Sequence, residues 1–264
     1  MKNIHKLALL ALAGVAFSTQ ALAITIGYYD SSRELYGFAN NGYLSNARDW
    51  LTAQGNTLVA INYADSAALS HVDAFYTGLI STVDATEVAA FQNFVNVQGG
   101  FLFIQTDWAD ATWTAPANQI LSSWGIVDSG SYTDDSGNHT VGTSSWVTDP
   151  NTVTGLTTSA HSVITSAPSN FEVLAQDDAN RTILGVFDAG AGRSSDVLIS
   201  TDINMWDNSY GYADTRNQQL WANIWTSATT QIDGGNTVPD SGSTLALLGL
   251  ALCAISGLRR RMHA

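Results

Sequence analysis

The sequence predicts an α/β domain with a mainly parallel sheet and helices on both of its faces. Short apolar runs alternate with helical patterns from Ile24 to Gln105, which is typical of βαβ units. Another buried run and a closing helix follow late in the chain, and right-handed crossovers place helices on both faces of such a sheet. A β-rich secreted sandwich is the alternative, because the middle of the chain is rich in Ser, Thr and Gly.

The elements are predicted from hydrophobic period and turn residues. Strands are expected at 24–29, 56–63, 74–80, 101–105 and 196–201, and a hairpin at 171–176 and 182–188. Helices are expected at 38–54, 116–126 and 213–227, with a further helix between Asp84 and Gly99-Gly100. Asp84 and Glu87 have the spacing of a capping box, which fixes where that helix begins. Residues 130–149 are polar and indicate an insertion or hairpin rather than a separate domain.

The first 23 residues are typical of a secretory signal peptide. Lys2 and Lys6 precede an apolar run from Leu7 to Phe17, and Ala21-Leu22-Ala23 supplies small residues at a cleavage site. The mature chain is therefore expected to begin near Ile24.

The last residues form a second targeting pattern. After a linker predicted at 231–237, residues 238–264 combine Val238, Pro239, Asp240, Ser241 and Gly242 with an apolar run and three arginines, Arg259 to Arg261. The apolar run from Leu245 to Leu258 has 14 residues, which span about 21 Å as a helix and fall short of a hydrocarbon core of about 30 Å. Snorkelling arginines can cover part of the shortfall and stay on the cytoplasmic side. A plain membrane anchor is the alternative interpretation.

This tail resembles the PEP-CTERM class of sorting tails, in the variant that reads Val-Pro-Asp-Ser-Gly. The resemblance implies an exported protein of the envelope, outer surface or extracellular matrix of a Gram-negative bacterium. It also implies a membrane-bound stage through the C-terminal helix, and processing by an exosortase-type enzyme. Proteins of this class are associated with exopolysaccharide, so an extracellular polysaccharide is the partner that it suggests.

The composition between the two ends narrows the chemistry. The domain at 24–230 and its linker hold 214 residues, with 22 acidic residues against five arginines and no lysine, for a formal charge of −17. Such a charge disfavours nucleic acid as a partner. The single cysteine, Cys253, lies in the tail, so the domain has no disulfide and no thiol nucleophile. There is no phosphate loop or dinucleotide fingerprint, and no cofactor is expected.

The domain resembles the glutamine amidotransferase-like superfamily, which has a three-layer flavodoxin-like fold. The segments that carry the resemblance are 84–107, 153–156 and 191–202, which hold a capped helix with Gly-Gly and a strand, a short apolar segment, and a Gly-Arg turn with a strand. Catalytic members place a cysteine after a central strand, where this chain has Gln105-Thr106-Asp107-Trp108. The resemblance therefore implies a domain without amidotransferase activity.

Candidate ligand-binding residues follow three predicted strands. Ligands of open parallel sheets bind beyond the carboxyl ends of the strands, where this chain places Asp30, Asp107 and Asp202. Aspartates near tryptophan suit a sugar, and they also suit a hard cation such as calcium. The alternative is that they cap the helices that follow. The candidates are Asp30, Asp107, Trp108, Asp202, Asn204 and Trp206.

The sequence leaves three functions open. We expect a non-catalytic envelope or matrix domain that binds a glycan, and we assign no catalytic residue. A polysaccharide hydrolase that uses paired carboxylates and a structural surface protein without a ligand are the alternatives. No metal site is expected, because His71, His139 and His161 lack ligand spacing and no calcium loop is present.

Overall fold

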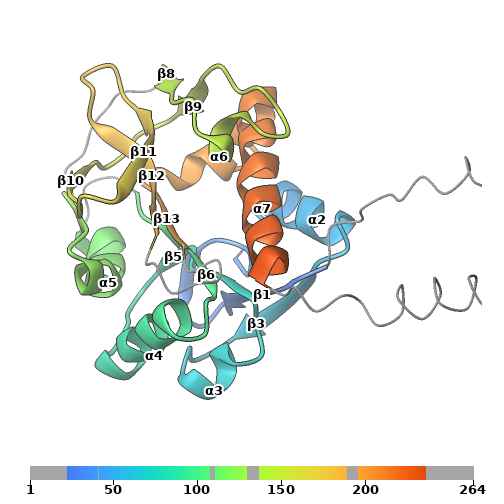
Figure 1. The fold of residues 1–264 in the computed structure, drawn as a ribbon, viewed down its shortest axis with the longest axis vertical. Coiled ribbons are helices and arrows are strands. Elements are labelled where there is room, and N and C mark those ends of the chain that lie inside the picture. The colour runs from blue at the N-terminus through green and yellow to red at the C-terminus, as the bar shows by residue number, and fades with distance from the viewer. Residues whose placement is uncertain (1–22, 41, 108–110, 130–136, 189–195, 236–264) are drawn as a thin grey trace, which may run out of the picture.

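The domain is a three-layer α/β structure, seen in a computed structural model that describes residues 23–40, 42–107, 111–129, 137–188 and 196–235 (Figure 1). Its helices are α2 (Ser45–Ala53), α3 (Ser66–Leu69), α4 (Ala85–Asn96), α5 (Ala111–Leu121), α6 (Ser145–Thr148) and α7 (Thr215–Gly235). Three 3-10 helices add η1 (Ser122–Trp124), η2 (Ile203–Trp206) and η3 (Gly211–Ala213).

Most of the strands form one 11-stranded sheet. Its centre is parallel and has the order β3 (Thr57–Ile61), β1 (Thr25–Tyr29), β4 (Ala74–Tyr76), β6 (Phe101–Gln105) and β13 (Asp196–Ser200). Because β1 lies inside this order and the chain winds outward to both sides, the centre is doubly wound. The predicted α/β class is confirmed.

An antiparallel extension continues the sheet beyond β13. It consists of β12 (Thr182–Asp188), β11 (Phe171–Gln176), β8 (Gly137–Val141) and β9 (Leu156–Thr158), with β7 (Val127–Asp128) and β10 (Ile164–Ser166) attached beside β12. The β11–β12 hairpin agrees with its prediction. β8 and α6 lie in the stretch interpreted as an insertion or hairpin, and β8 pairs with β11 as part of the main sheet.

Each face of the parallel strands carries its own hydrophobic core. Along β6, Phe101 and Phe103 belong to the core under α2 and α7, whereas Leu102 and Ile104 belong to the core under α3, α4 and α5. All four side chains are fully buried, as expected for strands that are covered on both faces. This alternation produces the three layers.

The helix boundaries agree with prediction where local signals set them. At α4, Asp84 accepts bonds from Thr86 N and Glu87 N, and the Glu87 side chain accepts from Asp84 N, so the capping box is confirmed. Helix α2 begins at Ser45 rather than at residue 38. Helix α7 continues to Gly235 and so occupies part of the stretch expected to be a linker, because Ile232 packs into the core.

Two segments pair away from the main sheet. β2 (Glu34–Tyr36) and β5 (Leu79–Ile80) form a two-stranded antiparallel sheet that the sequence did not predict. The expected strand at 74–80 is thereby divided into β4 and β5, separated by Thr77 and Gly78. Gly78 has φ of 60°, a left-handed conformation that favours glycine.

Several predicted features lie outside the described residues. They are the signal peptide up to Leu22, Trp108, the sorting motif Val238–Gly242, the apolar helix and the arginine cluster. Among the helices that are described, none combines the length and apolar character needed to span a membrane.

Candidate functional site

The carboxyl edge of the parallel strands brings together some of the predicted site residues. Strands β6 and β13 are neighbours, with Gln105 opposite Ser200, so Asp107 and Asp202 follow adjacent strands. The Gln105 amide links the two strands, since its Nε2 donates to Ser200 O at 3.0 Å. Its Oε1 accepts from Trp206 Nε1 at 3.0 Å. Gln105 therefore joins β6 to β13 and to η2 at this edge.

Asp202 caps η2 from a fully buried position. Its Oδ1 accepts from Asn204 N at 2.7 Å, and its Oδ2 accepts from Ser159 N at 2.7 Å. Burial raises the pKa of the Asp202 carboxyl to about 7, with a further contribution from the nearby charge of Asp207, although the backbone N–H groups oppose the shift. Asp202 thus fulfils the capping alternative and is not in contact with solvent.

Trp206 is a core residue. Its ring is fully buried, 5.0 Å from the Trp221 ring and 6.2 Å from the Phe103 ring. Because no face of the indole reaches solvent, Trp206 cannot stack on a sugar in this structure. Asn204 lies beside it in η2 and is partly buried.

Asp30 is separated from the other two aspartates because β4 lies between β1 and β6, and it makes its own local bonds. Its Oδ1 accepts from Ser32 N at 2.9 Å and Ser32 Oγ at 2.6 Å, and Asn62 Nδ2 lies 3.4 Å from Oδ2. These hydrogen bonds lower the pKa of the Asp30 carboxyl. Asp30 therefore organises the turn after β1 at the far side of the edge.

The exposed part of the edge is aromatic, which the sequence did not predict. The rings of Tyr36 and Tyr43 stack with centroids 4.5 Å apart and planes inclined by 9°. Tyr43 is 43% exposed, and the Tyr36 hydroxyl donates to Asp207 Oδ2. We call Tyr36, Tyr43, Asp107 and Asp207 the tyrosine edge. Asp107 belongs to it because it follows β6 at this edge. Burial and Asp207 raise the pKa of Tyr36, and the charge of Asp107 adds to this rise.

Hydrogen bonds of Asn208, mostly through its side chain, join the two loops of the tyrosine edge. Asn208 N donates to Tyr43 O at 2.9 Å, and Asn208 Nδ2 donates to Gly42 O at 2.7 Å and Ser45 Oγ at 2.8 Å. Asn46 N returns a bond to Asn208 Oδ1 at 3.0 Å. The loop after η2 is therefore fastened to the start of α2, which positions Tyr43. Tyr210, in the same loop after η2, is 60% exposed.

A buried carboxylate supports the loop under Tyr36. Glu34 accepts from Phe38 N at 2.9 Å, Ala39 N at 2.6 Å and Asn40 N at 3.1 Å. Burial raises the pKa of Glu34 to about 7, against the lowering effect of these three bonds. This nest uses the residues predicted as the first turn of α2, which explains why that helix begins later.

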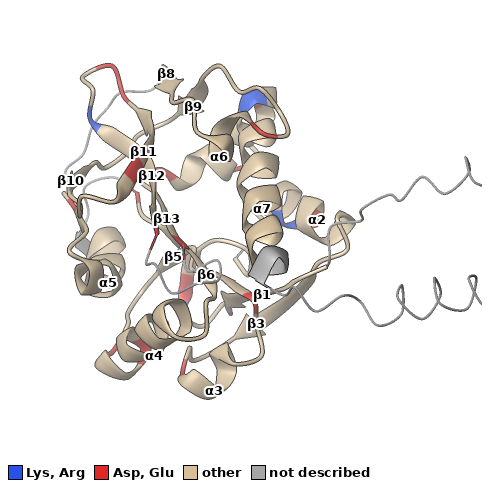
Figure 2. Ribbon diagram, in the orientation of Figure 1, with Lys and Arg blue, Asp and Glu red and all other residues tan. Residues whose placement is uncertain are grey.

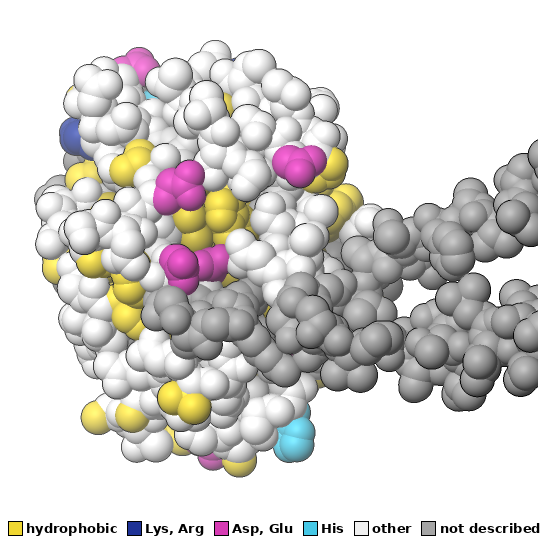
Figure 3. Space-filling view, in the orientation of Figure 1, with side chains coloured by type: hydrophobic (Ala, Val, Ile, Leu, Met, Phe, Trp, Pro, Cys, Tyr) yellow, Lys and Arg dark blue, Asp and Glu magenta, His cyan; other side chains and the backbone are white. Residues whose placement is uncertain are grey.

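Charged side chains are few, and most of them are acidic. Acidic residues are spread over several elements in Figure 2, and the face seen in Figure 3 is formed mainly of uncharged atoms. Within the described ranges, no three His, Cys, Asp or Glu side chains are grouped so that they could hold a metal ion. The arrangement suits neutral polar ligands that stack on aromatic rings.

The fold and the edge define an α/β domain without a thiol nucleophile, attached to a sorting tail. The VPDSG-CTERM motif family matches residues 237–262. The motif marks an exported protein directed towards the cell envelope, and it is consistent with processing by an exosortase-type enzyme. No curated protein matches the chain by sequence.

Solved structures with similar folds cover the domain. The mmIFT52 N-terminal domain is 12% identical, with a TM-score of 0.64 over 77% of this chain and 97% of that chain. A ThuA-like protein from Bacteroides uniformis is 11% identical, with a TM-score of 0.51 over 77% and 90%. A protein from Thermoplasma acidophilum that is named after GMP synthase is 9% identical, with a TM-score of 0.50 over 80% and 98%. These likenesses show the fold.

Proposed function

We propose that this protein is an envelope or extracellular matrix component whose α/β domain binds a glycan at the tyrosine edge without cleaving it. The observation that carries the proposal is the stacked Tyr36–Tyr43 pair, with Tyr43 exposed, at the carboxyl edge, where ligands of such sheets bind. An aromatic ring of this kind offers an apolar face to a sugar ring. The sorting tail supports an extracellular setting in which polysaccharide is available.

The carboxylates of the edge favour binding over hydrolysis. Asp107, Asp202 and Asp207 are all buried, and Asp202 and Asp207 accept bonds from the chain itself. A glycosidase needs two carboxyl groups that reach opposite sides of the scissile bond. The buried carboxylates instead hold the loops and orient the Tyr36 hydroxyl.

The test is affinity electrophoresis of the purified protein in gels that contain exopolysaccharide from an exosortase-bearing strain. We expect retardation by the glycan and no release of new reducing ends. Tyr43→Ala should weaken binding about fivefold or more, since loss of a stacked ring costs on the order of 1 kcal/mol or more. Tyr63→Ala, which removes a ring of equal size beside Asp84, is the matched control and should bind normally.

The other two functions have distinct outcomes. Release of reducing ends that is lost in Asp107→Asn would establish a hydrolase. The absence of both retardation and release, with and without calcium, would leave a structural surface protein.

A further inference from the structure

The domain begins between two side-chain acceptors at the amino edge of the sheet. Ile24 N donates to Asn56 Oδ1 at 3.1 Å, and Thr25 N donates to Asp73 Oδ2 at 2.8 Å. Asn56 is itself fixed, because its Nδ2 donates to Leu51 O at 3.1 Å. The first residues of β1 are therefore held by β3 on one side and by β4 on the other.

The change from exposed to buried chain falls at the expected signal-peptide cleavage site. Ala23 is exposed, whereas Ile24 is 3% exposed and belongs to the core under α2 and α7. Backbone bonds also begin at Ile24, whose carbonyl oxygen accepts from Thr57 N at 2.9 Å. Ile24 is thus part of the folded core, whereas Ala23 lies on the surface.

We propose that Asn56 and Asp73 form a binding site for the new α-ammonium group that cleavage creates at Ile24. The proposal rests on the predicted cleavage between Ala23 and Ile24. Hydrolysis of that peptide bond leaves a carboxylate on Ala23 and an amine on Ile24, which takes up a proton. The nitrogen changes from a neutral donor of one hydrogen into a cation with three hydrogens.

The two side chains supply what this cation requires. Asn56 Oδ1 already accepts a hydrogen bond from this nitrogen. The amide oxygen is neutral, so it does not neutralise the positive charge of the ammonium group. Asp73 supplies the negative charge one residue further along the chain. A nearby opposite charge favours the charged form of an amine. The acidic domain, with five arginines against 22 acidic residues, also favours an added positive charge.

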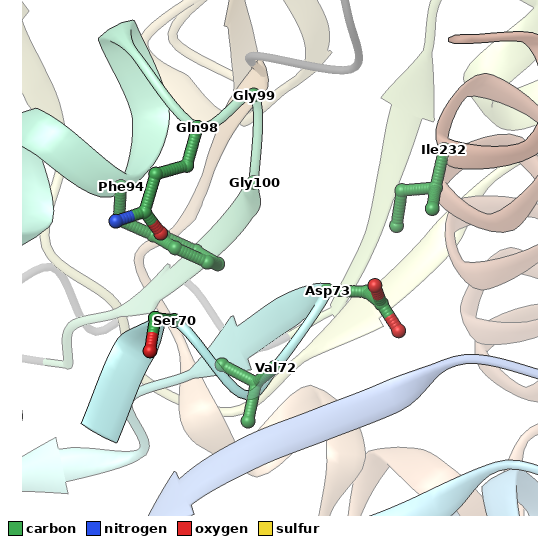
Figure 4. A pocket seen from close by; sticks show the side chains of 8 residues that line it. All are labelled: Ser70, Val72, Asp73, Phe94, Gln98, Gly99, Gly100 and Ile232. Atoms are coloured by element: carbon green, nitrogen blue, oxygen red, sulfur yellow. The ribbon is translucent and has the colours of Figure 1, made fainter. Parts of the chain in front are cut away.

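The surroundings of Asp73 leave room for hydration. Asp73 lines a pocket of about 430 Å³ together with Phe94, Gly100 and Ile232. Figure 4 shows Asp73 and Ile232 extending towards the same gap between the sheet and α7. Because Asp73 is exposed, the expected gain in stability is that of a surface ion pair, which is small.

Calorimetry on chains with defined starts tests the site. One chain begins at Ile24 and the other retains Ala23, which moves the ammonium group outward by one residue, and both continue to Ala264. We expect the Ile24 chain to melt about 2 °C higher, and Asp73→Asn to remove the difference while it keeps an oxygen acceptor for Thr25 N. Asp49→Asn removes an exposed carboxylate on α2 and should leave the difference unchanged.

Each contrary result overturns the proposal in a recognisable way. Equal melting temperatures of the two chains, or a difference that survives Asp73→Asn, would show that the pair does not bind the ammonium group. N-terminal sequencing of the exported protein tests the premise separately. A start at a residue other than Ile24 would remove the site from the natural protein while leaving the glycan proposal unaffected.

Discussion

At the scale of single residues, the aspartates that precede helices bind the backbone. Asp84 and Asp202 both accept hydrogen bonds from N–H groups two residues ahead, and Asp65 accepts from Ala68 N at 2.8 Å. Short acidic side chains are strong caps for this reason. Asp202, which follows β13, therefore acts as the cap of η2.

Asp202 should make the stability of the domain depend on pH. In the unfolded chain its carboxyl ionises near 3.8, whereas burial raises the pKa in the folded protein to about 7. Between these values the folded state holds more protons, so the free energy of unfolding falls as pH rises. Urea unfolding of the wild type and Asp202→Asn at pH 4 to 8 should show a shallower decline in the variant.

Asp30 provides the control for this experiment. The pKa of its carboxyl is lowered, so its titration lies below this pH range and Asp30→Asn should leave the decline unchanged. Glu34, whose pKa burial also raises to about 7, adds a decline of the same sign that both variants retain. A decline as steep in Asp202→Asn as in the wild type would show that Asp202 ionises normally in the folded state.

At the scale of elements, local signals were predictable and long-range pairings were not. The capping box of α4 is contained within four residues, and the β11–β12 hairpin within one short segment, so both could be read from the sequence. The β2–β5 sheet joins segments far apart in the chain. The Tyr36–Tyr43 stack depends on how Glu34 folds the loop between them, so no period or motif marks it.

The β11–β12 hairpin requires a glycine at position 185. A Cβ added there would lie 2.2 Å from Phe171 Cζ and 2.9 Å from Glu172 O, and the second atom belongs to the rigid backbone. Gly185→Ala should lower the free energy of unfolding by about 1–3 kcal/mol through overpacking. Chemical denaturation followed by tryptophan fluorescence measures the loss.

Gly137, in β8, is the matched control. A Cβ at this position meets nothing within 4 Å, so Gly137→Ala should change the free energy of unfolding by no more than about 0.5 kcal/mol. Equal effects of the two substitutions would contradict the steric explanation and indicate a general cost of replacing glycine in this sheet.

At the scale of the whole molecule, the signal peptide and the sorting motif together predict loss of both ends. In a cell with an exosortase-type enzyme, intact-mass spectrometry should give a mature chain that begins near Ile24 and ends close to the motif matched at 237–262. A strain that lacks the enzyme should retain the C-terminus at Ala264. A chain ending at Ala264 in both strains would favour a plain membrane anchor.

The two ends of the domain lie at one pole and the tyrosine edge lies at the other. Ile24 enters at the amino end of β1, and Ile232 of α7 borders the pocket beside Asp73 at the same amino edge, whereas Tyr36 and Asp207 lie beyond the carboxyl ends. A domain tethered through its last helix would point its recognition surface away from the tether. Reporter fusions at either terminus should therefore leave the tyrosine edge accessible, and neighbouring copies tethered to one membrane would display it in a common direction.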